Sequence, residues 1–267
     1  MSGVRPFGAI VTVALAVALC FLTLPVVAIF AGTPPAELVA SLGDPAALDA
    51  LSLSLQATLA ALAAIVCVGA PAAYVLATRS FRGRSAVITL VELPLVLPPA
   101  VAGIALLAAL GPQGLLGGWL EDAGVRLVFE TAGVVVALVF VAAPFFISQA
   151  QAAFSAVDRS WLEASRTLGA GEARTFLSVM VPSALPGLLS GLALAWGRAL
   201  GEFGATLIFA GSLSGVTQTA PLAIYELFAT DLNAALALSA VLVAISGALL
   251  LSVKLAGGRV APGLLAR

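Results

Sequence analysis

Arg198 and Glu202 place two opposite charges inside an apolar stretch of this 267-residue chain. Ionisable side chains inside a membrane span are rare and usually functional. The two residues lie four positions apart, so on a helix they share a face and can form an ion pair. Two interpretations stay open: a structural ion pair that fixes helix packing, or a pair that lies near a gate or a solute pathway.

The residues around this pair favour close packing and could bind a solute weakly. Gly197, Gly201 and Gly204 recur at spacings of four and three, and such small residues let helices approach closely. This stretch is therefore a candidate for a gate that opens by helix sliding, if the second interpretation of the pair holds. Hydroxyl and amide groups can bind a solute weakly enough to release it. The candidate donors nearby are Thr206, Ser212, Ser214, Thr217, Gln218 and Thr219.

Several kinds of chemistry are excluded by residues that the sequence lacks. There is no histidine, so His-ligated zinc and Ser-His or Cys-His catalysis are absent. The only lysine, Lys254, does not follow the glycine-rich turn of a P-loop. Any ATP hydrolysis that drives this protein must occur on another chain, and we expect no catalytic residue, metal or cofactor here. Cys20 and Cys67 lie in apolar runs and are expected to be small buried hydrophobes.

The composition is that of an integral membrane protein. Hydrophobic residues make up 61% and charged residues 9% of the chain, and the mean hydropathy is +1.15. A soluble domain has about 25% charged residues, so this chain could not cover a water-exposed surface. Each bilayer crossing needs a helix of about 20 apolar residues. Six stretches meet this requirement: Phe7–Phe30, Leu51–Thr78, Ala86–Leu110, Thr131–Phe154, Ser183–Gly211 and Leu232–Ala256.

Two of these stretches carry further signals. The first follows Arg5 and could be read as a signal peptide, but its length favours a retained transmembrane helix. The third contains Pro94, Pro98 and Pro99, and proline kinks a helix because it has no N–H to donate. The kink is either a simple bend or a bend that lines a cavity.

Basic residues predict the orientation, because cytoplasmic connections are rich in them. Of the 12 arginine and lysine residues, ten fall on one side of the predicted membrane, Arg126 falls on the other side, and Arg198 lies within a span. We therefore expect both termini to lie in the cytoplasm.

The longest cytoplasmic connection, Ser155–Pro182, predicts two short helices with a break between them. Capping-box patterns start at Ser155 and Ser160, and Gly169 and Gly171 should end the first helix. Four residues share one face of that helix: Val157, Trp161, Ala164 and Leu168. A short helix with a tryptophan and mixed charges suits a groove in a protein partner better than a lipid surface. An ordinary solvated connector is the alternative.

This connection resembles the EAA loop of ABC importer permeases, whose pattern reads Glu-Ala-Ala, three residues, Gly, nine residues, Ile-x-Leu-Pro. The chain has Glu163-Ala164-Ser165, then Gly169, then Val179-x-Val181-Pro182 at the same spacing. The resemblance covers about residues 50–255 and implies a coupling helix that contacts a separate ATPase subunit. The residues that it implies for coupling are Trp161, Glu163, Ala164, Ser165, Gly169 and Pro182.

Further runs resemble the molybdate and tungstate permeases of this family. The run 197–206 is shared in looser form with sulfate permeases, whereas 217–225, Thr-Gln-Thr-Ala-Pro-Leu-Ala-Ile-Tyr, is more specific to the molybdate branch. The run 93–99 fits the same group. The resemblance implies molybdate or tungstate as cargo. The alternatives are a sulfate or thiosulfate ABC permease and an ion-coupled secondary carrier with Arg198 and Glu202 as a charge relay.

The resemblance also implies an architecture and an assembly. We expect an all-α membrane protein with six transmembrane helices, the transmembrane domain of a type I ABC importer. Residues 1–50 would form an N-terminal helix and outer loop, 51–256 the core with its EAA loop at about 155–182, and 257–267 a cytoplasmic tail. The implied partners are a second copy of this chain, two ATPase subunits that bind ATP and Mg²⁺, an extracytoplasmic oxyanion-binding protein and membrane lipids, but no nucleic acid. The implied location is the cytoplasmic membrane of a prokaryote.

Overall fold

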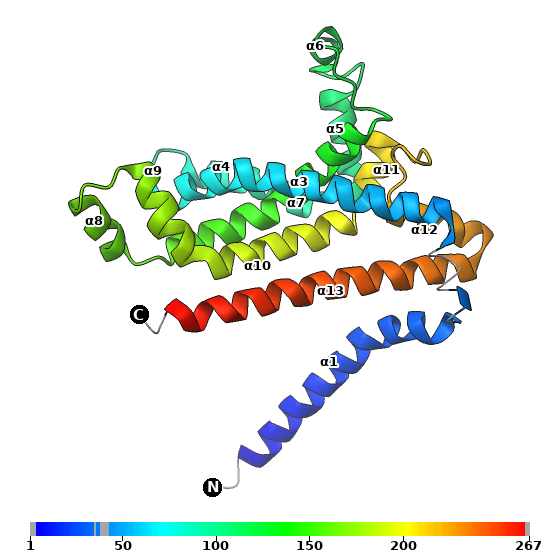
Figure 1. Ribbon diagram of the computed structural model, residues 1–267, viewed down its shortest axis with the longest axis horizontal. Coiled ribbons are helices and arrows are strands. Elements are labelled where there is room, and N and C mark those ends of the chain that lie inside the picture. Colours follow the sequence, from blue (N-terminus) through cyan, green and yellow to red (C-terminus); the bar gives the residue numbers. More distant parts are fainter. Residues whose placement is uncertain (1–3, 35, 38–42, 265–267) are drawn as a thin grey trace.

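A computed structural model describes residues 4–34, 36–37 and 43–264, and every regular element in these ranges is helical (Figure 1). The elements are α1 (Val4–Gly32), α3 (Pro45–Thr78), α4 (Arg84–Val96), α5 (Pro99–Leu110), α6 (Gly117–Asp122), α7 (Thr131–Ser155), α8 (Arg159–Thr167), α9 (Glu172–Thr175), the π-helix η1 (Phe176–Met180), α10 (Val181–Leu200), α11 (Gly204–Ala210), α12 (Ala220–Thr230) and α13 (Leu232–Leu264). Five helices of the described ranges are long and apolar enough to cross a membrane, and the bent pair of α4 and α5 makes up to six.

Helix α7 is the centre of the bundle and packs against both α3 and α10 (Figure 1). Glycines make these approaches possible: Gly69 of α3 lies against Phe146, and Gly187 of α10 lies against Ala153. Small residues let helices of a membrane protein pack by van der Waals contact. The core between the three helices includes Ala57, Ala61, Ile65, Leu138, Ala142, Phe146 and Ala184.

The bundle has two distinct ends. At one of them, here named the α8 end, lie α8, α9, the turn between α3 and α4, and the last turns of α13 (Figure 1). The opposite end, named the α12 end, holds α12 and the start of α13. Three parts of the chain that were predicted to share one side of the membrane, α8, the α3–α4 turn and the end of α13, thus lie at the same end of the bundle.

Helix α1 extends away from the rest of the bundle and packs mainly on α13 (Figure 1). Its apolar side chains are exposed. Cys20 of α1 and Cys67 of α3 are both free and exposed, so the expectation that they are buried is wrong. In a membrane span this costs little, because lipid tails are as apolar as a protein core.

The third predicted span, Ala86–Leu110, consists of two helices, and the chain bends by 118° between them. Leu97 and Pro98 have extended backbone angles, because Pro98 and Pro99 cannot donate an N–H and each disfavours helical geometry in the residue before it. At 1.5 Å per residue, α4 and α5 are each about 20 Å long or less, short of the roughly 30 Å hydrocarbon core. The expected kink is therefore a break, and only the pair together can form one span.

The fifth predicted span, Ser183–Gly211, also ends earlier than its hydropathy suggests. Helix α10 stops at Leu200, and α11 begins at Gly204 after a short break. The Glu202 carboxylate accepts a hydrogen bond from the Ala205 backbone N–H at 2.7 Å, which satisfies one of the free donors at the start of α11. Helix α12 was not predicted as a separate element, because its 11 residues are too few to cross a bilayer. The other four predicted spans lie within α1, α3, α7 and α13 and are confirmed.

A methyl group at Gly187 should destabilise the contact between α7 and α10. A Cβ atom built there would lie 2.5 Å from the Cβ of Ala153, whereas one at Gly197 of the same helix has nothing within 4 Å. We expect Gly187→Ala to lower the free energy of unfolding by about 1–3 kcal/mol, the usual cost of overpacking. Thermal unfolding in detergent measures this effect. The matched variant Gly197→Ala should unfold at the wild-type temperature, and equal melting of the two variants would contradict the packing described.

Candidate functional site

Helix α8 begins at a defined cap. The Asp158 carboxylate accepts a hydrogen bond from the Ser160 backbone N–H at 2.9 Å, and this bond holds the pKa of the Asp158 carboxyl below its ordinary value. The predicted start at Ser155 is wrong, because Ser155 is the last residue of α7. The predicted start at Ser160 is also displaced: the aspartate two positions earlier caps the helix, as aspartate commonly does.

Gly169 ends α8 in the way that the sequence predicts. Its φ is +82°, a left-handed conformation that glycine adopts without the steric cost of a Cβ. The Gly169 N–H donates to the Arg166 carbonyl at 2.9 Å, and the Ala170 N–H donates to the Ser165 carbonyl at 3.1 Å. These two bonds form a Schellman motif, so the helix terminates sharply at this residue.

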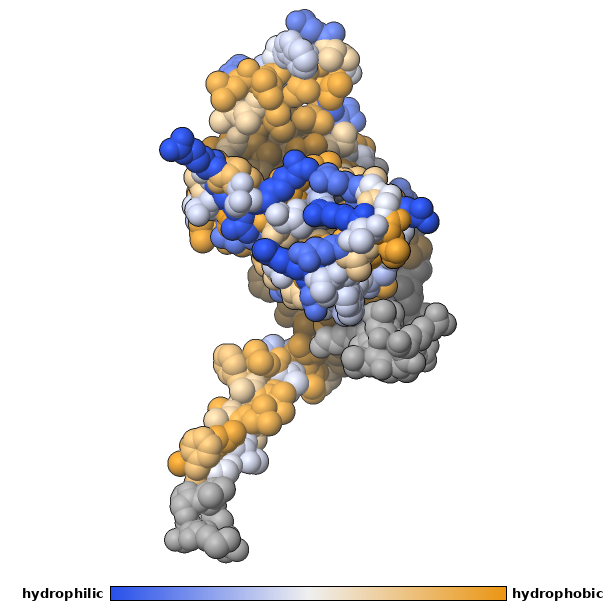
Figure 2. Space-filling model, turned by 90° about the vertical axis from the view of Figure 1, so that its left-hand side faces the viewer, coloured by the Kyte–Doolittle hydropathy of each residue, from blue (hydrophilic) through white to orange (hydrophobic). Residues whose placement is uncertain are grey.

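The two faces of α8 differ in what they contact. Leu162 packs against the core of the bundle, as does Val157 just before the helix. Trp161 and Leu168, in contrast, are 54% and 87% exposed, and Ala164 beside them is also exposed. Three of the four residues predicted to share a face thus form an apolar surface without cover from this chain. Figure 2 looks onto the α8 end, where hydrophilic side chains gather. An apolar tryptophan surface within a polar rim is typical of a protein-docking site.

The second part of the connection attaches α8 to the bundle. The hydroxyls of Ser165 and Thr175 are hydrogen-bonded at 3.1 Å, and Arg79 forms an ion pair with Glu172 at 3.2 Å. From Glu172 the chain continues through α9, η1 and α10 as one long helical segment. Pro182 lies in the first turn of α10, directly after η1. The chain between α8 and the far end of α10 is therefore helical except for the short turn around Gly169.

The predicted ion pair between Arg198 and Glu202 is present at the far end of α10. The Glu202 side chain is 1% exposed and that of Arg198 is 28% exposed. Glu202 thus links the last turn of α10 to the first turn of α11. Close packing continues at Gly204, where a Cβ would lie 2.8 Å from the Cβ of Pro99. Within the described residues, a Cβ at Gly197 would meet nothing within 4 Å, and one at Gly201 would meet only the Gly197 carbonyl of its own helix at 3.5 Å. The expected close approach therefore holds for one of the three glycines.

Two of the six candidate oxyanion donors, Thr217 and Gln218, are hydrogen-bonded within the described residues. Thr206, Thr217, Gln218 and Thr219 are all buried. The Thr217 hydroxyl accepts a hydrogen bond from the Leu213 N–H, and Gln218 donates to Glu226. In the described residues the hydroxyls of Thr206 and Thr219 have no partner. The structure brings these residues together around the loop 211–219, but as buried groups and not as the lining of an open pathway.

Two tethers of this loop were not predicted. The Thr131 hydroxyl donates to the Val216 carbonyl at 2.8 Å, and the Ser54 hydroxyl accepts from the Ala220 N–H at 2.7 Å. Ser54 lies on α3, more than 160 positions from its partner, and a lone serine in an apolar helix carries no signal for such a contact. The arginines of the α3–α4 turn were considered only for orientation, although their density in 79–84 is a signal for a site.

The fold defines a class: a multi-pass helical membrane protein with a short exposed helix, α8, at one end of its bundle. The family described as "Binding-protein-dependent transport system inner membrane component" matches residues 65–265. The chain belongs to this family, whose members are the transmembrane components of ABC importers. ATP hydrolysis in these systems is carried out by a separate ATPase subunit.

Named relatives and one solved structure agree with this assignment. The "Molybdenum transport system permease protein ModB" of Mycobacterium tuberculosis is 42% identical over 87% of this chain and 88% of its own length. A "Probable sulfate transport system permease protein" of Nephroselmis olivacea is 33% identical over 82% of this chain and 77% of its own. A bacterial ABC transporter for the import of the polysaccharide alginate matches with a TM-score of 0.76 over 96% of both chains at 17% identity, which shows a shared fold.

Proposed function

We propose that this chain is the permease subunit of an ATP-driven importer of molybdate or tungstate. The observation that carries the substrate is its 42% identity, over nearly the whole chain, to a molybdenum permease. The sulfate alternative has weaker support, since the sulfate relative is 33% identical over a smaller share of each chain. The run 217–225, which resembles the molybdate branch, forms the end of the loop 211–219 and the start of α12.

The proposed assembly contains two copies of this chain in the cytoplasmic membrane of a prokaryote, with the pathway between them. The α8 end would face the cytoplasm with both termini, since α8, α9 and the chain around the α3–α4 turn carry six of the ten basic residues counted from the sequence: Arg79, Arg82, Arg84, Arg159, Arg166 and Arg174. Two ATPase subunits, with ATP and Mg²⁺, would dock on the exposed surface of α8. An oxyanion-binding protein would dock at the α12 end, in keeping with the family's dependence on binding proteins.

The proposed mechanism uses α10 as a lever. Closure of the ATPase pair on ATP would pull α8, and the Ser165–Thr175 bond and the Arg79–Glu172 pair support transmission of this movement into α9. Helix α10 has 20 residues, which is about 30 Å at 1.5 Å per residue. The displacement would reach Arg198, Gly201, Glu202 and Gly204 and switch the dimer from inward-open to outward-open. Thr206, Thr217, Gln218 and Thr219 would then contact the anion only after rearrangement.

Uptake by cells that lack this chain tests the cargo. We expect the deletion to abolish accumulation of radiolabelled molybdate at low external concentration while sulfate accumulation stays at the wild-type level. Restoration of uptake by the wild-type chain is the control. Loss of sulfate accumulation with normal molybdate accumulation would overturn the proposed substrate. Uptake by the purified protein in vesicles without ATP or ATPase would instead indicate an ion-coupled carrier.

Reversing the charge of Glu163 should uncouple ATP hydrolysis from transport. The Glu163 side chain is exposed on α8, so Glu163→Lys reverses a charge that α8 presents to a partner and leaves the core intact. We expect uptake in proteoliposomes to fall by about tenfold, the effect of losing roughly 1.4 kcal/mol at the contact, while membrane insertion is normal. Glu163→Gln, which removes the charge without reversing it, should lose less. Full uptake by Glu163→Lys would contradict docking through α8.

A further inference from the structure

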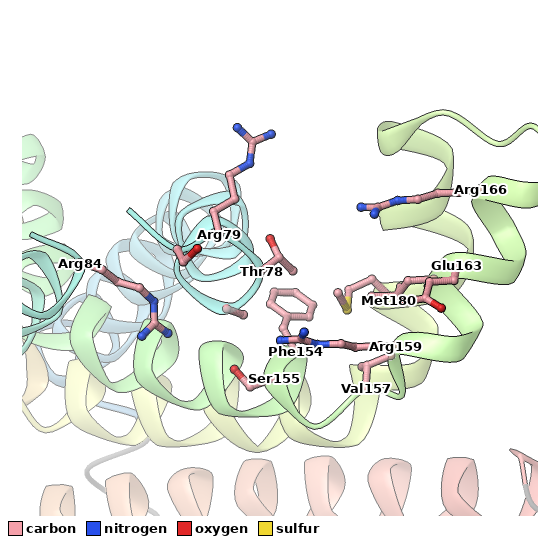
Figure 3. Close-up of a pocket in the computed structure, with 13 residues that line it drawn as sticks. Thr78, Arg79, Arg84, Phe154, Ser155, Val157, Arg159, Glu163, Arg166 and Met180 are labelled. Atoms are coloured by element: carbon pink, nitrogen blue, oxygen red, sulfur yellow. The ribbon is translucent and has the colours of Figure 1, made fainter. Parts of the chain in front are cut away.

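A cavity of about 570 Å³ lies at the α8 end between α8, the end of α7 and the turn that joins α3 to α4 (Figure 3). Its lining contains four arginines, Arg79, Arg84, Arg159 and Arg166. We call it the arginine cavity. Figure 3 shows Arg166 and Arg159 extending from α8 across the cavity toward α3 and α7. The long cationic side chains thus come from two elements that are far apart in the sequence.

The charges that line the arginine cavity do not balance. Glu163 is the one carboxylate among its lining residues, so four positive groups face one negative group. Arg79 pairs with Glu172, outside the lining, and the Nε of Arg84 donates to the Leu76 carbonyl at 2.8 Å. Within the described residues, no carboxylate oxygen lies close enough to Arg159 or Arg166, at 4.0 Å or less, to form an ion pair.

The surroundings of these arginines suit an anion of tetrahedral shape. Phe154 and Met180, which are buried, form an apolar part of the lining beside the exposed side chains of Arg159 and Arg166. Thr78, Ser80 and Ser155 add hydroxyl groups to the lining. Guanidinium groups bind planar pairs of oxygens of phosphate-like anions through two parallel N–H donors.

We propose that the arginine cavity is a binding site for a tetrahedral oxyanion, supplied either by a free inorganic anion or by the phosphate of an anionic lipid. Such a ligand would join Arg159 and Arg166 of α8 to Arg84 at the start of α4. The site lies apart from the exposed docking surface of Trp161 and Leu168. A bound anion would hold α8 against the bundle and so restrain the coupling of ATP hydrolysis to transport. This consequence rests on the proposed function, whereas the site itself does not.

Binding to the purified full-length chain, without any ATPase subunit, tests the site. In nanodiscs of phosphatidylcholine, we expect saturable binding of radiolabelled molybdate and of phosphate in equilibrium dialysis. Arg159→Gln combined with Arg166→Gln should weaken this binding at least about tenfold, since hydrogen bonds to charged groups are lost. The matched control is Arg82→Gln with Arg174→Gln, which removes the same charge from the same end outside the lining. It should stay within about twofold of the wild type, because exposed charges farther away are screened by salt.

A second arm distinguishes the source of the anion. If a lipid phosphate occupies the site, phosphatidylglycerol in the nanodiscs should raise the unfolding temperature of the wild type but not that of the variant with Arg159→Gln and Arg166→Gln. The same lipid should compete with free phosphate for the site. The variant Arg159→Lys with Arg166→Lys keeps the charge and loses the bidentate geometry, so it should bind the anion with intermediate affinity. It also tests the site if the glutamine variant does not fold.

Three outcomes would overturn the proposal. The first is no dependence of the wild type on anion or lipid, and the second is an equal loss of binding in the control variant. The third is that the variants lose only capture of the ATPase subunit, which would make the cavity a protein contact.

Discussion

Proline in place of Gly169 should abolish coupled transport while the protein still inserts into the membrane. The φ of Gly169 is +82°, whereas proline is restricted to about −65°. The substitution also removes the N–H that donates to the Arg166 carbonyl, so the Schellman end of α8 cannot form. An incompatible proline in a helix costs about 3 kcal/mol, which is roughly a hundredfold in the population of the correctly ended helix. We expect molybdate uptake in proteoliposomes to fall more than tenfold while ATP hydrolysis by the assembled complex continues.

A control two residues farther along separates this effect from a general intolerance of proline. Gly171 has a φ of −68°, it donates no backbone hydrogen bond in the structure, and a Cβ there would meet nothing within 4 Å. Gly171→Pro therefore fits the backbone and should retain most of the uptake. Coupled uptake at the wild-type rate in Gly169→Pro would show that the sharp end of α8 has no part in coupling.

Removal of Arg198 should have the largest effect on stability. The Arg198→Met variant leaves the Glu202 carboxylate, which is 1% exposed, without its ion-pair partner. Breaking a buried pair in this way costs about 3–5 kcal/mol, because an uncompensated charge stays in a low dielectric. We expect a large decrease in unfolding temperature in detergent. The double variant Arg198→Met with Glu202→Gln should recover much of the loss, since the glutamine oxygen can still accept the Ala205 N–H.

The same double variant separates the two interpretations of the pair. If Arg198 and Glu202 only fix the junction of α10 and α11, the neutral double variant should both fold and transport. If they belong to the gate or the pathway, the double variant should be stable and yet fail to accumulate molybdate. A stability that is unchanged in Arg198→Met alone would contradict the buried ion pair itself.

Much of the fold could be predicted because each transmembrane helix is determined by the residues of its own segment. A stretch of about 20 apolar residues must be helical wherever it crosses, so four of the six spans follow from composition alone. The end of α8 at Gly169 is also local, since it depends on one residue that tolerates a left-handed conformation. The spacing of Glu163, Gly169 and Pro182 was enough to indicate the family that the chain belongs to.

Only the tertiary structure decided where helices break and which surfaces stay free. Hydropathy cannot separate α10 from α11, because the break depends on Glu202 accepting the Ala205 N–H and on Gly204 packing against Pro99 at the bend between α4 and α5. Trp161 lies on a predicted apolar face, but its exposure depends on Leu162 taking the place against the core. The arginine cavity joins residues about 80 positions apart. The sequence by itself thus determined the spans and the class of protein, since these depend on neighbouring residues, whereas the gate region and the cavity depend on distant contacts that form only when the bundle packs.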